Sequence, residues 1–459
     1  MKSVPCDPRN PDCQRTISDD WELKHQKEDE ESVKQYNTPE SLALSAYKPN
    51  LTWRRSWRER HSLNFFVQFT VPQMAGFFDS TFWYRIVIQS SYHEAAIMHA
   101  TIAIGAMHEA IMQRSYTDER RKGQAMEFAL NQCNLAISSL TNARSSSARG
   151  RISDSKLALI TCVLFTCFEA MQGRCDSAVS HALQGRKLLQ AMENPDQGTK
   201  TAFEESDIEQ MRPLVERLEI QALALVDKGK RTDPPMTDRF TPLPDVAFIF
   251  TLDHAHNALH MGLNSIMRFM QTLVSTPTKE EAALNMAEKH TRYASWFQQW
   301  ELAFFTFITS NRATISDTDL KRAMVLKANH LVGTMLASVD QSAGPVAYDP
   351  YENEFKAIVD LSREVLATFS APPLPTLSRG PGAAPYLSFS LWVTDPLWMA
   401  ISRCRNPGIR QAAFTLLSQN PRQEGIWHAG PRMANNRYMT KGQEANGAKE
   451  KTAGGKKVG

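Results

Sequence analysis

The sequence predicts an all-α protein, a large irregular multi-helix domain flanked by disordered N- and C-terminal tails. Apolar residues recur at the spacing of one helix face, strand-like alternation is nearly absent, and clusters of proline and glycine separate the helical stretches. We expect a disordered polar segment at 1–60, the helical domain at 61–428 and a low-complexity basic tail at 429–459.

Four stretches carry the helical pattern. From Glu119 to Leu140 one stripe is formed by Met126, Ala129, Leu130, Cys133, Ile137 and Leu140. The stretches Lys321–Val339 and Glu352–Phe369 repeat this spacing, whereas Leu157–Phe168 is apolar on nearly all sides and is expected to be buried. The only candidate strand is the short segment Val246–Phe250.

The sequence shows one helix–turn–helix pair. Elsewhere, short segments rich in proline, glycine or serine, called breakers here, interrupt the helical pattern. The pair is Ser155–Ala170 and Cys175–Glu193, joined by a glycine-containing turn at 172–174. The breakers lie at 145–150, 194–198, 229–245 and 371–385, and the last of these contains five prolines that no helix can cross.

Composition excludes several classes of protein. The formal net charge is +3, from 52 basic and 49 acidic residues, which is too near neutral to indicate nucleic-acid binding by itself. No apolar run approaches the ~20 residues of a membrane span, and no secretion signal opens the chain. With seven cysteines, an odd number, we expect a soluble intracellular protein with reduced thiols.

A series of short segments resembles one known family. In chain order they are Phe77–Trp83, Val87–Ser91, His93–Ala100, Ala103–Glu109, Phe165–Glu169, Ala178–Leu189, Tyr351–Leu366, Asp395–Leu397, Cys404–Arg410 and Glu424–Trp427. Their order and spacing resemble the fungal-specific transcription factor domain, the regulatory region of zinc-cluster transcription factors. The resemblance covers roughly residues 60–428.

The resemblance implies a regulator of transcription in the nucleus, with the cytoplasm as the alternative location. It implies control of a metabolic or secondary-metabolite gene set and action through protein–protein contacts. The partners it implies are other transcription factors or regulatory proteins, in a homodimer or a heterodimer. Independently of the resemblance, the sequence contains no recognisable motif of an enzyme or of a bound cofactor and no long apolar run, so we expect no enzyme activity, no cofactor and no membrane association.

In that family a module of six cysteines holding two zinc ions reads DNA. The amino-terminal part of this sequence offers only Cys6 and Cys13, and two thiolates cannot complete one tetrahedral zinc site. We therefore expect no zinc-cluster module and no direct sequence-specific DNA binding. The alternatives are a helical interaction or scaffold protein, or a fragment of a mis-split zinc-cluster activator.

Two histidine groups are candidate metal sites. His93 and His99 are six residues apart, so they cannot share a metal as the two histidines of a zinc-protease motif do. Asp253, His256 and His260 lie on one helix face and could form a His/His/carboxylate site, but an ordinary amphipathic helix explains them equally well. We expect no catalytic, cofactor-binding or metal-binding residue.

Two further features have alternative interpretations. The basic segment Trp53–Arg60, with interleaved aromatics, is a loose nucleic-acid signal or the start of a helix packed on the core. That segment or the tail at 449–457 is also a candidate nuclear-import signal. Phe304, Phe305 and Phe307 cannot all point the same way, so some of them are core residues and others could line a pocket or a partner surface.

Overall fold

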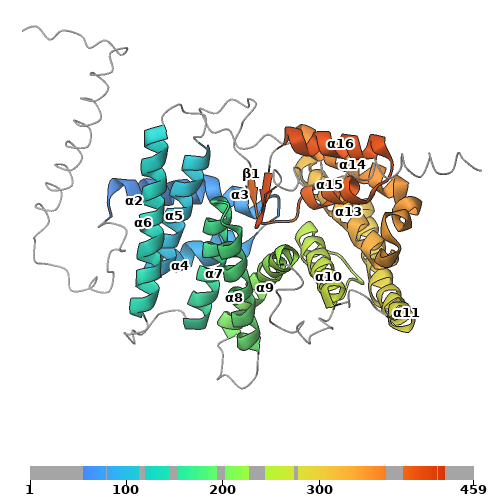
Figure 1. Cartoon of the computed structure of the whole chain (residues 1–459), viewed down its shortest axis with the longest axis horizontal. Coiled ribbons are helices and arrows are strands. Elements are labelled where there is room, and N and C mark those ends of the chain that lie inside the picture. The colour runs from blue at the N-terminus through green and yellow to red at the C-terminus, as the bar shows by residue number, and fades with distance from the viewer. Residues whose placement is uncertain are drawn as a thin grey trace, which may run out of the picture. The chain divides into compact units, whose positions relative to one another are not determined.

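The computed structural model describes residues 55–78, 80–112, 119–143, 154–193, 202–226, 243–272, 278–368, 386–420 and 422–428. Nearly all of these residues are helical, which confirms the predicted all-α class (Figure 1). The predicted tails lie almost wholly outside the described residues, as do the breakers at 145–150 and 194–198, so the domain boundaries remain a prediction.

The helices and strands follow in chain order. In the first half they are α2 (Trp57–Phe65), the π-helical turn η2 (Phe66–Thr70), α3 (Val71–Ala75), the π-helical turn η3 (Phe82–Val87), α4 (Ile88–His93), α5 (Ala95–Met112), α6 (Glu119–Ala143), α7 (Asp154–Met171), α8 (Cys175–Glu193) and α9 (Ala202–Leu225). In the second half they are α10 (Leu252–Thr272), α11 (Lys279–Glu288), the π-helical turn η6 (Lys289–Ala294), α12 (Ser295–Ser310), α13 (Asp317–Ser338), the 3₁₀ segment η7 (Gln341–Tyr351), α14 (Glu352–Thr368), β1 (Tyr386–Ser388), α15 (Thr394–Arg403), α16 (Pro407–Gln419), β2 (Arg422–Glu424) and β3 (Trp427–His428).

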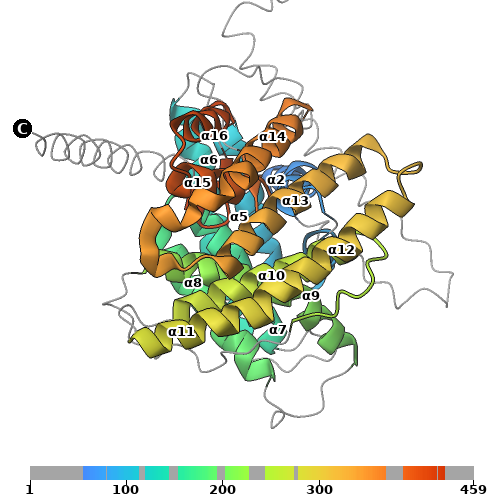
Figure 2. The ribbon, with the colours of Figure 1, turned by 90° about the vertical axis from the view of Figure 1, so that its right-hand side faces the viewer.

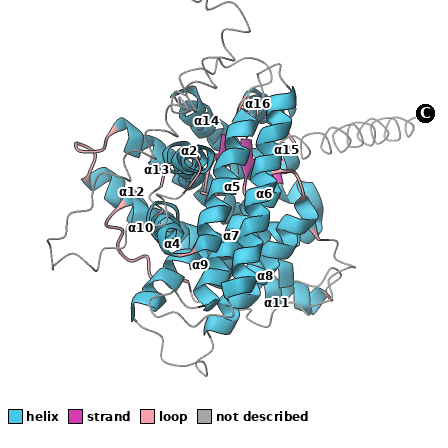
Figure 3. Ribbon diagram, turned by 90° about the vertical axis from the view of Figure 1, so that its left-hand side faces the viewer, coloured by secondary structure: helices cyan, strands magenta, loops and turns pink. Residues whose placement is uncertain are grey.

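The buried apolar side chains form two clusters. The amino-terminal cluster is built mainly from α5 to α9 and includes Trp83, Ile104, Phe168 and Leu214. The carboxyl-terminal cluster is built from α10 and α12 to α16 and includes Trp300. Figure 2 shows α10, α12 and α13 on one side of the molecule, and Figure 3 shows α5 to α8 side by side on the other.

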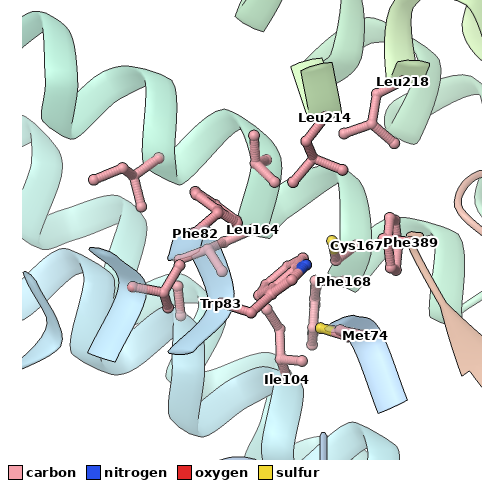
Figure 4. Close-up of a cluster of buried hydrophobic side chains, with 14 of the residues drawn as sticks. Met74, Phe82, Trp83, Ile104, Leu164, Cys167, Phe168, Leu214, Leu218 and Phe389 are labelled. Carbon is pink, nitrogen blue, oxygen red and sulfur yellow. The ribbon is translucent and has the colours of Figure 1, made fainter. Parts of the chain in front are cut away.

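Helix α5 is a largely buried helix of the amino-terminal cluster. It packs against α2, α6 and α7, and its Ile104 meets Trp83 and Phe168 in the interior (Figure 4). By length and composition α5 could cross a membrane, alone among the described helices, although no comparable apolar run was expected from the sequence. In this structure 72% of its apolar window is buried by the neighbouring helices, as is typical of a core helix.

The turn between α7 and α8 confirms the predicted helix–turn–helix pair. Gly173 has a φ of +75°, which glycine adopts without a steric penalty. Its N–H donates to the Ala170 carbonyl at 3.0 Å, and the Arg174 N–H donates to the Glu169 carbonyl at 3.0 Å. These two bonds close the end of α7 in the pattern of a Schellman motif.

Helix α6 departs in part from its predicted stripe. Ala129 and Cys133 are buried as expected, but Leu130 and Ile137 are 38% and 47% exposed. The buried face is instead completed by Gln132 and Ala136, and α6 lies against α5 along this face. In the predicted stripe of α13, Val325, Ala328, Met335 and Val339 are buried, whereas Leu331 and Val332 are half-buried. The predicted stripe of α14 is buried from Phe355 to Leu366, while Phe369 lies outside the described residues, and the predicted burial of α7 is confirmed.

The predicted strand at Val246–Phe250 is wrong. This segment has no regular structure, and Phe248 and Phe250 are largely exposed. The strands lie elsewhere: β1 pairs in parallel with β2, with Leu387 opposite Gln423, and β2 pairs in antiparallel with β3. Strands of two or three residues are too short to show alternation and depend on tertiary contacts, such as the 2.8 Å bond from the Gly425 N–H to the Ser388 carbonyl.

Two glycine substitutions test the close packing of α5. A Cβ at Gly105 would lie 2.2 Å from the Ser62 backbone oxygen of α2, whereas a Cβ at Gly123 of α6 would meet nothing within 4 Å. We expect Gly105→Ala to lower the free energy of unfolding by about 1–3 kcal/mol through overpacking. Gly123→Ala is expected to raise it by up to ~1 kcal/mol through helix propensity.

Urea unfolding followed by circular dichroism measures both glycine effects. Stabilisation by Gly105→Ala would show that α2 and α5 do not approach as closely as described.

Candidate functional site along helix α9

Helix α9 carries several charged side chains into the protein interior. Asp207, Glu216, Arg217 and Glu219 are each less than one tenth exposed. Buried charges are stable only when opposite charges or hydrogen bonds compensate their lost hydration. The partners of these four residues therefore indicate which elements α9 holds in place.

The amino-terminal half of α9 is paired with the amino-terminal cluster. Asp207 accepts a 2.5 Å hydrogen bond from the Nζ of Lys156 in α7 and a 2.9 Å bond from Nη2 of Arg85 in η3. Lys156 is itself buried, so each of these two charges depends on the other.

The middle of α9 joins α8 to α10 through two arginines. Glu219 lies 3.4 Å from Arg186 of α8 and 2.9 Å from Arg268 of α10, measured from nitrogen to oxygen. Glu216 lies 3.8 Å and 3.5 Å from the same two arginines. Burial raises the pKa of Glu216, although both arginines favour its charged form.

Arg217 extends the pairing to the carboxyl-terminal elements. Its Nη2 lies 3.3 Å from Asp395 of α15 and 3.5 Å from Glu424 of β2. Burial, together with the nearby Asp395 carboxylate, raises the pKa of Glu424 to about 7. Glu424 therefore changes its charge near neutral pH.

A cavity of about 270 Å³ lies beside Arg217. Its walls come from α9, α10, α13, η7, α15 and the segment before α15. Most of its lining is apolar: Ile220, Leu263, Met267, Met270, Val332, Leu336, Leu391, Trp398 and Met399. Its polar lining includes Arg217, Gln221, Asn264, Asn329, Asp395, Ser402 and Arg403.

The residues Asp253, His256 and His260 do not form a metal site. His256 and His260 are buried with ring centres 5.6 Å apart, and His256 stacks on Phe78 at 4.0 Å. Burial lowers the pKa of His256 to about 3, while Asp253 is ion-paired with Arg322. Within the described ranges no group of three or more His, Cys, Asp or Glu side chains is arranged to hold a metal.

The other histidine candidates also stay apart. His93 is exposed at the end of α4, and Glu94 is buried at the junction with α5. His99 shares a 2.7 Å hydrogen bond with Gln132 of α6.

Among the cysteines considered in the sequence, Cys404 lies within the described residues. It is buried, and burial raises the pKa of its thiol, which makes it a weak nucleophile. Cys6 and Cys13 lie outside the described residues.

The described part of the basic segment Trp53–Arg60 forms the start of a helix. Ser56 caps α2, and Arg58 donates to the Gln124 carbonyl at 2.9 Å while lying 4.3 Å from the Phe128 ring centre. The alternative in which Trp57 packs on the core is wrong, because Trp57 is more than half exposed. Arg58 therefore makes contacts within the protein.

The aromatic segment of α12 divides as its spacing predicts. Phe304 is buried in the carboxyl-terminal cluster, and Phe307 packs partly against it. Phe305 is 68% exposed, as is Leu302 at 63% one turn earlier. Helix α12 therefore presents apolar side chains at the protein surface.

Glu219→Gln tests the buried pairing of α9. This change removes one of the two buried carboxylates that pair with both Arg186 and Arg268, so we expect the free energy of unfolding to fall by about 3–5 kcal/mol. The matched control is Glu209→Gln on the same helix, whose carboxylate is exposed and pairs with Arg212 three residues away, so it should cost under ~1 kcal/mol.

Chemical unfolding of the two Glu→Gln variants at pH 7 provides the measurement. Equal losses in the two variants would contradict a structural role for the buried pairs.

Glu424→Gln tests the pH dependence of this region. Between about pH 5 and 7 the folded protein keeps a proton on Glu424 that the unfolded chain, with a glutamate pKa near ~4.3, has released. The unfolded state then binds fewer protons, so the stability of the wild type falls as pH rises through this window. We expect Glu424→Gln to gain on the order of 2–4 kcal/mol relative to the wild type between pH 5 and 8.

Unfolding free energies measured across this pH range, with Glu209→Gln as the control, test the assignment. A difference between wild type and Glu424→Gln that is independent of pH would refute the raised pKa.

Comparisons with known proteins agree with the resemblance noted in the sequence. Residues 61–218 match the fungal specific transcription factor domain, which spans the chain from α2 into α9. The aspercryptin biosynthesis cluster-specific transcription regulator atnN of Emericella nidulans is 20% identical over 421 residues, covering 74% of this chain and 67% of that protein. No solved structure matches the chain. Residues 61–218 are therefore similar to the fungal specific transcription factor domain.

Proposed function

We propose that this protein is a nuclear regulator of transcription that acts through contacts with other proteins. The observation that carries the proposal is the match of residues 61–218 to the fungal specific transcription factor domain. The name of the relative, a transcription regulator specific for a biosynthesis cluster, supports a secondary-metabolite gene set as the target.

We propose that these 459 residues alone do not recognise a specific DNA sequence. Only Cys6 and Cys13 lie in the first sixty residues, too few thiolates for the two-zinc cluster that reads DNA in the related factors.

The exposed apolar side chains of α12 support protein contacts. Leu302 and Phe305 lie three residues apart and therefore on neighbouring positions of one helix face. Large apolar side chains exposed together are typical of protein–protein surfaces, where aromatic residues contribute much of the binding energy. We propose that this face of α12 contacts the regulatory machinery.

A reporter assay tests the proposed role directly. The full chain fused to a foreign DNA-binding domain should change reporter output relative to the DNA-binding domain alone. In parallel, the unfused chain should show no sequence-selective shift of DNA in gels at near-physiological salt, where non-specific phosphate attraction is weakened. Selective, salt-resistant binding would refute the proposed lack of DNA reading, and a silent fusion would favour the scaffold interpretation.

Variants of α12 make this assay specific. We expect the fusion carrying Leu302→Asp and Phe305→Asp to lose its effect on the reporter, because two charges oppose burial of this face. Gln411→Asp is the control, an added charge at an exposed polar position of another helix, α16, and should keep the effect. Equal expression and melting temperature of the variants exclude misfolding, and retained activity of the double variant would show that this face is not used.

A further inference from the structure

We propose that the cavity beside α9 binds a small organic acid, with its carboxylate at Arg403 and a compact apolar body along α10 and α13. This inference concerns binding of a ligand and goes beyond the proposed role in transcription, since neither the family match nor the relative's name identifies a ligand.

The size of the cavity limits the ligand. Its volume of about 270 Å³ is near the lower end of ligand pockets, which span ~300–1,000 Å³. It corresponds to about nine liquid waters at ~30 Å³ each. A molecule of roughly ten non-hydrogen atoms therefore suits it better than a drug-sized ligand.

The walls of the cavity favour an apolar body. Met267 and Met270 of α10 lie among the lining residues together with Val332 and Leu336 of α13 and Trp398 of α15. Methionine side chains are flexible and polarisable, so they adapt to irregular ligand shapes. Burial of hydrocarbon against this lining supplies a favourable free energy that is not specific for charge.

Arg403 supplies the charge specificity. It is the last residue of α15, it lines the cavity, and its guanidinium lies 5.7 Å from the ring centre of the buried Tyr348. Within the described residues no acidic side chain is ion-paired with Arg403, whereas Arg217 faces both Asp395 and Glu424. A carboxylate is the group that matches an arginine fork in both charge and geometry.

The position of Asp395 sets the orientation of the acid. Asp395 lies eight residues before Arg403 on the same helix, about 12 Å away along its axis at ~1.5 Å per residue. At the Asp395 end Arg217 already balances the charge of the Asp395 carboxylate, so the carboxylate of a ligand is attracted to the Arg403 end. An eight-carbon chain spans much of this length with its apolar part between the two charges.

Ligand binding here would join the two hydrophobic clusters. Arg217, Ile220 and Gln221 belong to α9, whereas the opposite walls belong to the carboxyl-terminal elements. A ligand that contacts both sides only in the folded protein raises the free energy of unfolding as its concentration rises above its Kd.

Isothermal titration of the full chain with three probes of the same length tests the proposal. The probes are octanoate, the neutral octanamide and the cationic octylamine. We expect octanoate to bind at least tenfold more tightly than octanamide, and octylamine to bind most weakly, because the guanidinium selects the anion. Equal binding of octanoate and octanamide, or no octanoate binding at millimolar concentration, would overturn the proposal.

Two arginine variants locate the site. Arg403→Gln should weaken octanoate binding at least tenfold and leave octanamide binding nearly unchanged. Arg405→Gln is the matched control, because Arg405 is exposed, pairs with Asp349 and does not line the cavity, so it should bind octanoate like the wild type. Val332→Phe, which fills the cavity, should weaken both probes.

Unchanged circular dichroism and melting temperature of the unliganded variants establish that they fold. An equal loss of octanoate binding in Arg403→Gln and Arg405→Gln would place binding elsewhere and overturn the proposal. Ligand binding is measured separately from reporter output. A failure of the ligand proposal therefore does not affect the proposed role in transcription, and the reverse also holds.

Discussion

The described fold depends on how helix α9 neutralises the charges it carries into the interior. Asp207 meets Lys156 of α7, Glu219 meets Arg186 of α8 and Arg268 of α10, and Arg217 meets Asp395 of α15 and Glu424 of β2. Each charge would be costly if left unpaired in the interior. These ion pairs therefore hold helices of both hydrophobic clusters at fixed positions relative to α9. Contacts between apolar faces alone would define these positions less strictly.

The position of α9 also connects the family match to the rest of the chain. The match to the fungal specific transcription factor domain ends at residue 218, within α9, and covers the helices of the amino-terminal cluster. The pairs of Glu219 with Arg268 and of Arg217 with Asp395 link this region to the carboxyl-terminal elements. The cavity lies at that link, so a bound ligand would act where the two clusters meet.

The sequence predicted the helices well and the interior charges poorly. Apolar periodicity predicts α13 and α14 because apolar residues recur at the helical spacing along their buried faces, such as Val325, Ala328 and Met335 in α13. The acidic and basic residues of α9 look like a solvated face, since their burial depends on partners far away in the sequence, such as Arg268 and Glu424. The strands β1 and β2 form for the same kind of reason, through tertiary contacts, while among the described residues the segment Val246–Phe250 has no partner strand.

The central claim is that the buried charge pairs of α9 make the two hydrophobic clusters one cooperative unit. Differential scanning calorimetry at low protein concentration measures this directly, by comparing the calorimetric enthalpy of unfolding with the van't Hoff enthalpy from the shape of the transition. A single transition with a ratio near one is the result expected here. Two resolved transitions, or a calorimetric enthalpy near twice the van't Hoff value, would show that the clusters unfold independently and would contradict this account.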